Sequence, residues 1–435
     1  MSGSAPSDLK KNLLLNNIEL LRTTLKSYLL LGAVLGGMQT VSLFASNWTL
    51  TDLGTLGGSE TFADSINDLG QVVGMSRLDG DSDTHAFFYA NGLMEDMAPI
   101  NSGDIRASFR LGLNNVGQIA SGVVVDDAYY PAIFNRQTRQ TTSLGTLGST
   151  FGFTGVATGI NDSGVAVGIS YLNSGVRHGF VYRNGTMSDL GSLGGYSGAL
   201  ALNRAGTAVG FSSDSPSGFQ RAVIWNNGSI LDISNGFESQ ARAINDSGQV
   251  VGETGTVTGN EEAFLWSNGS SENLGTLTPG RNSEAFGINN ERNIVGTSEA
   301  ISSITFQTNP ITGVITIVTN FQNHAFLYSN GSMLDLNSVI STNSGWELYY
   351  AFGINNSDQI VGWGSMDGGQ HIRSFILQVP EPSVPTLLLL FAGLFAFRAR
   401  SLRLERLLNP VPLKQFHKVD TAVEIELFNK KGVGS

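Results

Sequence analysis

Residues 244–252 read INDSGQVVG, and near-copies of this stretch stand at 66–74, 160–168 and 202–210. Asn, Asp and Gly favour tight turns, because Asn and Asp tolerate left-handed backbone geometry and Gly adopts it at no steric cost. The apolar residues that follow are typical of a buried strand. The stretch therefore predicts a hairpin turn that leads into a strand and recurs along the chain.

An Ile-Asn or Leu-Asn pair recurs at seven equivalent repeat positions, at successive spacings of 47, 47, 42, 42, 44 and 66 residues. Gly follows seven residues after the Asn in six copies, and Ser121 takes its place in the second copy. A period near 45 built from short strands is typical of propeller blades. We predict that residues 47–379 form an all-β, seven-bladed propeller of four-stranded blades. The predicted turn residues are Asn67, Asn114, Asn161, Asn203, Asn245, Asn289 and Asn355.

Each repeat continues with a third strand such as HAFFY (85–89) or HAFLY (324–328). Asn-Gly follows this strand in five repeats, and it is the strongest sequence signal for a two-residue hairpin. A fourth strand of the MSDLGSL type completes the unit. In the first strand, the residue two before the repeated Asn is small in all seven copies, and the residue four before it is Ala in six. On a regular strand these positions share a face, so we expect both to point to where the blades converge.

The last repeat stops after its third strand, whereas a fourth-type strand, WTLTDLGTL (48–56), precedes the first repeat. We expect 48–56 to pair with 373–378 and to close the ring. Asp52, Asp189, Asp232 and Asp335 recur on this outer strand. We expect their charge to protect the sheet edge from pairing with other chains.

The composition excludes several classes of function. The chain has no cysteine, which excludes disulfides, thiolate metal sites and cysteine nucleophiles. All seven lysines lie outside 47–379, where 13 arginines stand against 29 acidic residues, a formal net charge of −16. Such a body repels a phosphate backbone, so no nucleic-acid partner is expected.

No motif in the sequence indicates catalysis. His85, His178 and His324 share one repeat position, which favours a packing or hydrogen-bonding role, and His371 has no neighbouring acid–nucleophile pattern. The sequence has no phosphate-binding glycine loop, His-Glu zinc motif or nucleophile elbow. We assign no catalytic residue, metal ligand or cofactor.

The variable loops between the second and third strands, and those between blades, should lie on one face. They carry Asp126-Asp127 with Tyr129-Tyr130, and Glu261-Glu262, and residues 304–318 read as an extra hairpin. Asp79, Asp81 and Asp83 alternate in one loop, a pattern that suits calcium. A solvated acidic loop is the alternative for these three residues.

The two ends differ from the body. Residues 1–46 have a basic stretch followed by an apolar run, which predicts an export signal; an uncleaved N-terminal anchor is the alternative. Residues 384–397 are apolar but short for a membrane-spanning helix. The basic residues Arg398 and Arg400 follow them, and residues 401–435 form an atypical basic tail.

Two resemblances to known families rest on these motifs. VPEPSVPTLLLLFAGLFAFRAR (379–400) resembles the PEP-CTERM sorting signal, with its Pro-Glu-Pro motif, apolar run and basic end. That resemblance implies export, transient inner-membrane anchoring and processing by an exosortase. The family's signal normally ends the protein, whereas 35 residues follow here, and an ordinary tail anchor is the alternative. The residues that carry the resemblance are Pro380, Glu381, Pro382, Arg398 and Arg400.

The body is similar to the HAF repeats of extracellular bacterial proteins, through HAFFY, HAFLY and AINDSGQVVG. We therefore expect a binding or structural propeller at the cell surface or in the extracellular matrix, associated with exopolysaccharide or another surface protein. The alternative is a polysaccharide hydrolase or lyase that uses carboxylates on the variable face, which would need two carboxyl groups about 5–9.5 Å apart.

Overall fold

The computed structural model describes residues 48–380, except 82, 98–110, 150–151 and 309–314. These residues belong to one compact unit, Met1–Pro380, and the second unit, Glu381–Ser435, contains no described residue. The predicted export signal and four of the five sorting residues, all but Pro380, therefore lie outside the described residues. Within the described part of the chain, no helix is long and apolar enough to cross a membrane.

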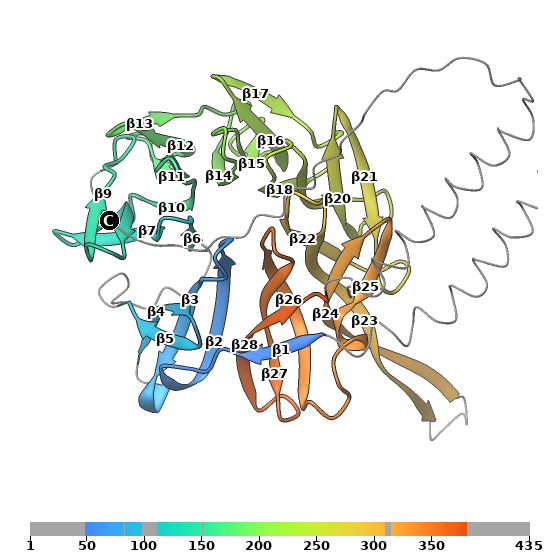
Figure 1. Ribbon diagram of the computed structural model, residues 1–435. Helices are drawn as coiled ribbons and strands as arrows, with labels where there is room; N and C mark the ends of the chain where they lie inside the picture. The colour runs from blue at the N-terminus through green and yellow to red at the C-terminus, as the bar shows by residue number, and fades with distance from the viewer. Residues whose placement is uncertain (1–47, 82, 98–110, 150–151, 309–314, 381–435) are drawn as a thin grey trace, which may run out of the picture. The chain divides into compact units, whose positions relative to one another are not determined.

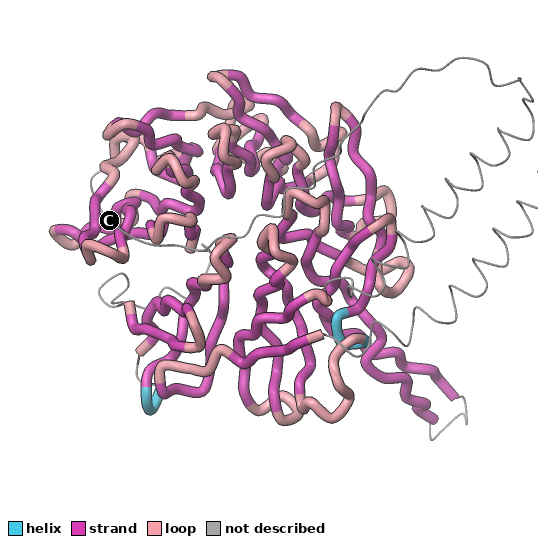
Figure 2. Tube along the Cα trace, in the orientation of Figure 1, coloured by secondary structure: helices cyan, strands magenta, loops and turns pink. Residues whose placement is uncertain are grey.

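The described chain forms seven four-stranded antiparallel sheets arranged around a central axis, so the predicted propeller is confirmed (Figure 1). Apart from strands, the described residues contain two short 3₁₀ turns, η1 (Asp79–Asp81) and η2 (Leu336–Ser338) (Figure 2).

Blades one to four each use four consecutive strands. Blade one contains β2 (Gly57–Ile66), β3 (Val72–Leu78), β4 (Thr84–Ala90) and β5 (Leu93–Asp96). Blade two contains β6 (Gly112–Leu113), β7 (Gln118–Val125), β8 (Ala128–Asn135) and β9 (Gln140–Ser143). Blade three contains β10 (Gly155–Ile160), β11 (Ala166–Tyr171), β12 (Arg177–Arg183) and β13 (Thr186–Asp189). Blade four contains β14 (Ser197–Leu202), β15 (Ala208–Ser213), β16 (Gln220–Asn226) and β17 (Ser229–Asp232).

The remaining blades include the one that joins the two ends of the propeller. Blade five contains β18 (Ser239–Ile244), β19 (Val250–Gly255), β20 (Glu261–Ser267) and β21 (Ser270–Gly275). Blade six contains β22 (Ser283–Ile288), β23 (Ile294–Thr308), β24 (Ile315–Ser329) and β25 (Ser332–Asp335). Blade seven contains β26 (Trp346–Ile354), β27 (Gln359–Met366), β28 (His371–Gln378) and β1 (Thr49–Asp52).

The predicted ring closure is confirmed by the pairing of β1 with β28. The register runs from Thr49 opposite Gln378 to Asp52 opposite Phe375. Beyond β1, the Leu53 amide donates to the Ser374 carbonyl at 3.0 Å. Leu53 is buried in a cluster that joins Val361 of blade seven to the first blade. The first described strand therefore completes the last blade and packs against the first.

The core lies between adjacent blades rather than within one sheet. Each main apolar cluster combines residues of two neighbours, as where Leu265 of blade five packs with Ile294 and Phe326 of blade six. The Phe of the third strand is fully buried in most blades. This explains why a single blade would be unstable, since its apolar faces are covered only by its neighbours.

The repeated Gly on the second strand is required by a close backbone approach. A Cβ at Gly252 would overlap the Gln240 carbonyl of β18, and the equivalent Gly residues of five other blades meet the equivalent carbonyl. Ser121 stands at this position in blade two, where β6 is described as only Gly112–Leu113. The Gly of the repeat therefore reflects contact between the first and second strands.

The prediction that the two small positions of the first strand share a face is wrong. In six blades the register of the first strand shifts by one residue between these positions, as between Ala241 and Ala243. The bulge separates their roles. The Ala four before the Asn is fully buried between blades, whereas the small residue two before it lines the central channel. There a Cβ at Gly112 would lie 2.9 Å from the Gly159 Cα of the next blade.

The outer-strand Asp residues have structural partners within their own blades. Asp189 accepts from the Gly191 amide at 2.7 Å, and Asp52 accepts from the Gly54 amide at 2.9 Å. Asp232 lies 3.3 Å from the Arg221 guanidinium. The Asp189 and Asp52 contacts, and the 2.8 Å bond that Asp232 accepts from the Ser234 amide, cap the turn that follows the outer strand. The recurrence of Asp therefore has a local structural cause, and its role in protecting the sheet edge stays a prediction.

Candidate functional site

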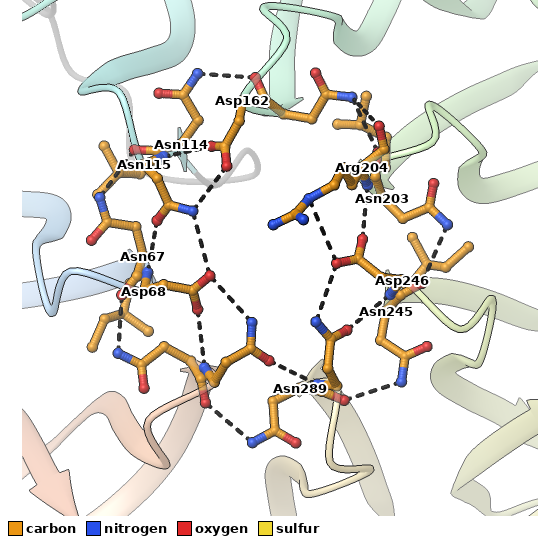
Figure 3. A pocket seen from close by; sticks show the side chains of 18 of the residues that line it. Asn67, Asp68, Asn114, Asn115, Asp162, Asn203, Arg204, Asn245, Asp246 and Asn289 are labelled. Carbon is orange, nitrogen blue, oxygen red and sulfur yellow. Dashed lines mark hydrogen bonds and ion pairs between the residues drawn. The ribbon is translucent and has the colours of Figure 1, made fainter. Parts of the chain in front are cut away.

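The seven repeated Asn side chains form a closed ring of hydrogen bonds around the channel (Figure 3). In every blade the Asn Nδ2 donates to the backbone carbonyl of the equivalent Asn in the next blade, at 2.9–3.3 Å. Asn355 of blade seven donates to the Asn67 carbonyl of blade one at 3.0 Å, which closes the ring. All seven Asn residues are buried.

The same Asn also holds its own turn. The Asn245 Oδ1 accepts from the Ser247 amide at 3.1 Å and from the Gln249 amide at 3.0 Å. Sequence reasoning identified the turn but missed the contact between blades. The signal was the constancy of Asn, because an ionised Asp could accept these bonds but could not donate one, whereas the Asn amide does both.

The residue after each Asn forms a second ring at the same mouth of the channel, inside the Asn ring as drawn in Figure 3. Asp246 Oδ1 accepts from the Arg204 amide at 3.0 Å, and Asp68 Oδ1 accepts from the Asn356 amide at 3.0 Å. The cavity at this mouth measures about 240 Å³. Since most ring oxygens already accept hydrogen bonds between blades, we interpret this mouth as scaffold. The ring residues are Asp68, Asn115, Asp162, Arg204, Asp246, Asn290 and Asn356.

Deeper in the channel the repeat breaks down. The first strands run toward the Asn ring, so the residues three before each Asn lie roughly 10 Å further in. They line a second cavity of about 210 Å³. Five residue types fill these seven positions, so this part of the channel is where a function specific to the chain would be found. The residues are Asp64, Leu111, Thr158, Leu200, Arg242, Phe286 and Phe352.

Arg242 and Glu253 form an ion pair in blade five, in which the carboxylate is buried and the guanidinium is partly exposed. Arg242 Nε lies 3.0 and 2.9 Å from the two Glu253 carboxylate oxygens, and Nη2 lies 2.7 Å from Oε1. Only 7% of the Glu253 side chain is exposed, and Glu284 of blade six lies 3.8 Å from Arg242. Burial raises the pKa of Glu253 to about 6 despite the opposing charge of Arg242. Burial lowers the pKa of Arg242, but the charge of Glu253 outweighs it and the net pKa is raised.

Aromatic side chains from three blades continue this region. Phe286 of blade six stacks on Phe352 of blade seven, with ring centroids 4.9 Å apart. Tyr350 lies 4.4 Å from Trp363, which contacts Phe62 of blade one edge-on at 5.5 Å. The Arg242 guanidinium lies 5.8 Å from the Phe286 ring. We call this region the charged–aromatic end of the channel; it comprises Phe62, Arg242, Glu253, Glu284, Phe286, Tyr350, Phe352 and Trp363.

Sequence reasoning missed the charged–aromatic end, although a signal existed. The residue after the repeated Gly of the second strand is Met75, Ile169 or Phe211 in three blades, but Glu253 in blade five. A carboxylate at a repeat position that is apolar in four blades and Thr297 in blade six marks a place where the scaffold alone does not determine the residue. Trp363 stands at the same position in blade seven.

The repeated histidines pair with the outer-strand Asp residues across adjacent strands. Nδ1 of His85 lies 2.9 Å from Asp96, and Nδ1 of His324 lies 2.8 Å from Asp335. His178 makes the equivalent pair with Asp189. These contacts support the hydrogen-bonding role predicted for the three histidines.

The acidic loop at 79–83 does not assemble into an ion site. The Asp81 carboxylate accepts from both the amide and the hydroxyl of Ser59 at 2.8 Å, and these bonds lower its pKa. Asp83 accepts from the Thr84 amide at 2.7 Å. Nowhere in the described ranges do three or more His, Asp or Glu side chains form a group that could hold a metal ion.

No protein-family model and no curated protein sequence matches this chain. Among solved structures, it is similar to the β-propeller domain of the Trilobed protease from Pyrococcus furiosus, at 7% identity and a TM-score of 0.45, covering 75% of this chain and 97% of that one. It is also similar to an oligogalacturonate lyase from Vibrio parahaemolyticus, at 10% identity and a TM-score of 0.45, covering 77% and 97%. At these levels neither resemblance bears on what this chain binds.

Proposed function

We propose that this protein is an exported, non-catalytic propeller that binds an extracellular polysaccharide at the charged–aromatic end of its channel. The observation that carries the proposal is the local loss of repeat symmetry there. Six blades have the repeated Gly on the second strand. Only blade five has a charged residue in the position after it, where Glu253 forms an ion pair with Arg242. Burying an ion pair is generally no more stabilising than apolar packing, so its presence favours a role in binding.

The chemistry of this end suits a sugar chain. Aromatic rings offer apolar faces to the C–H surfaces of a sugar ring, and Tyr and Trp add polar groups at their edges. A guanidinium and carboxylates beside such rings supply the few directed hydrogen bonds that fix a ligand in a mainly apolar site. Arg242, Phe286 and Phe352 line the channel cavity, and Tyr350 and Trp363 pack against Phe352.

The geometry favours binding over the hydrolase or lyase. An acid–base mechanism needs carboxylates that are free to exchange protons with substrate. Arg242 instead donates to both oxygens of Glu253. Export, transient anchoring and exosortase processing remain part of the proposal on the resemblance of 379–400 alone. Mass spectrometry of secreted protein ending near residue 380 would support them, and an intact 401–435 tail would contradict them.

The binding proposal is tested with purified protein on an array of bacterial and plant polysaccharides. We expect at least one acidic or neutral polysaccharide to bind, and Trp363→Ala to weaken that binding at least tenfold. Phe219→Ala is the matched control, because Phe219 is 73% exposed and lies on a loop of blade four. Equal loss in both variants, or no binding at all, would contradict the proposal. Release of shortened or unsaturated products would instead identify an enzyme.

A further inference from the structure

The hairpin of blade six extends well beyond its sheet. β23 and β24 pair from Ile294 opposite Tyr328 out to Thr308 opposite Ile315. β22 pairs with β23 only as far as Ser298, and β25 pairs with β24 only from Phe326 to Ser329. Among the described strands, none pairs with the outer part of this hairpin, which projects from the propeller (Figure 1).

One face of the projecting hairpin is an exposed apolar stripe. Ile304 pairs with Thr319 and Phe306 pairs with Ile317, so these side chains share a face of the two-stranded ribbon. Ile304 is 54% exposed, Phe306 69% and Ile317 64%. At the base of the stripe, Phe321 is covered by the Arg281 guanidinium, 3.4 Å from its ring centroid. The stripe is therefore open only along its outer part.

The hairpin also lacks the charges that usually protect an exposed strand. No Asp, Glu, Lys, Arg or His occurs from Ala300 to Asn323, although the body has a net charge of −16. Natural edge strands commonly carry charges, especially Lys, that prevent pairing with another chain. A neutral apolar ribbon that projects from an acidic body is thus built to contact something.

We propose that the apolar stripe is a self-association surface, on which a second copy of this chain lays its own hairpin. Two acidic bodies repel each other at short range, and a neutral projection is the part of the molecule where two copies meet without that repulsion. Identical stripes are self-complementary about a two-fold axis. An anionic membrane surface fits less well, because the ribbon has no basic residue to attract it.

The test is the oligomeric state of the full chain, measured by sedimentation over a hundredfold range of protein concentration. We expect a monomer–dimer equilibrium, and Phe306→Asp should raise the dimer dissociation constant at least tenfold. Thr305→Asp is the matched control, because it adds the same charge to the neighbouring position on the opposite face. Both variants should keep the melting temperature of the wild type, since the stripe lies outside the blade.

Three outcomes would overturn the proposal. The first is a monomer at every concentration. The second is an equal increase of the dimer dissociation constant in the Phe306→Asp and Thr305→Asp variants. The third is a monomer that binds neutral phosphatidylcholine vesicles and loses this binding in Phe306→Asp, which would assign the stripe to a lipid surface. None of these outcomes depends on the polysaccharide site, because the stripe and the channel share no residue.

Discussion

Gly252 shows how a single missing Cβ sets the geometry of a blade. A Cβ here would overlap the Gln240 carbonyl, whereas at Gly255, on the same strand, it would meet the Glu238 carbonyl at 3.4 Å. Neither Gly has a positive φ, so the two positions differ in space rather than in backbone conformation.

Gly252→Ala should therefore lower the free energy of unfolding by about 3 kcal/mol, the upper range for overpacking. Gly255→Ala should change it by less than about 1 kcal/mol. Chemical denaturation of both variants measures the difference. Similar values for the two would show that the first and second strands separate at little cost, against the contact proposed for the repeat.

The His324–Asp335 pair should make stability depend on pH. Burial lowers the pKa of His324, but Asp335 and Glu347 outweigh it and raise it above 6.5. Burial raises the pKa of Asp335, but its bonds to His324 and Asn337 outweigh it and lower it below 3.8. The contribution of the His is complete below pH 6.5 and is lost as the pH rises through its folded pKa. The stability contribution of Asp335 is complete above pH 3.8 and is lost as the pH falls through its folded pKa.

His324→Gln should therefore destabilise the protein by about 1 kcal/mol at pH 5.5, as expected of a partly exposed ion pair. The difference from wild type should shrink at pH 8.5. Thermal melts across this range measure it. His371→Gln is the control, because the histidine ion pairs of the described residues involve His85, His178 and His324 but not His371. A constant difference at every pH would show that packing, not charge, explains the effect.

At the scale of the element, β1 joins the two ends of the propeller into one sheet. Leu53, just beyond β1, is 4% exposed and packs at the seam between blades seven and one, whereas the neighbouring Thr51 is exposed. Leu53→Ala should cost about 2–3 kcal/mol, by loss of burial and creation of a cavity. Thr51→Ala should change the free energy of unfolding by less than about 0.5 kcal/mol. Equal small effects, measured by denaturation, would mean that the seam contributes little.

Elements with local signals and the closure of the ring were predictable, whereas features that depend on the exact register of paired strands were not. The Asn-Gly turns and the strand after INDSG follow from short-range backbone preferences. The pairing of 48–56 with the last strand followed from counting strands. The bulge between Ala241 and Ala243 could not be predicted from the alternation of residue types along the strand, because an extra residue in one strand is recognised only when its partner strand is known.

The charged–aromatic end was missed for a related reason. Its members come from blades five, six, seven and one, and only the closed ring brings them together. Arg242 and Glu253 are 11 residues apart in sequence, but nothing local to either residue indicates a buried ion pair. The comparison of equivalent repeat positions identifies Glu253 as unusual. It becomes informative once the repeats are known to line one channel.

At the scale of the whole molecule, the Asn ring tests whether the propeller is closed. Asn245 and Asn355 have matched environments. Each Oδ1 accepts from two turn amides, and each Nδ2 donates to a Gln at 2.8 Å and to the next blade's carbonyl at 3.0 Å. They differ in one respect, because blades five and six are consecutive in the chain, whereas Asn355 spans the seam to blade one.

Asn245→Ala and Asn355→Ala should each lower the free energy of unfolding by about 2–3 kcal/mol, because each leaves buried backbone groups without partners. In a closed ring the two values should agree within about 0.5 kcal/mol, since both interfaces must separate when the propeller unfolds cooperatively. In a ring that opens at the seam before it unfolds, the contact of Asn355 is already broken in the opened state, so Asn355→Ala would cost clearly less. Chemical denaturation of the two variants, followed by both fluorescence and circular dichroism, distinguishes these cases.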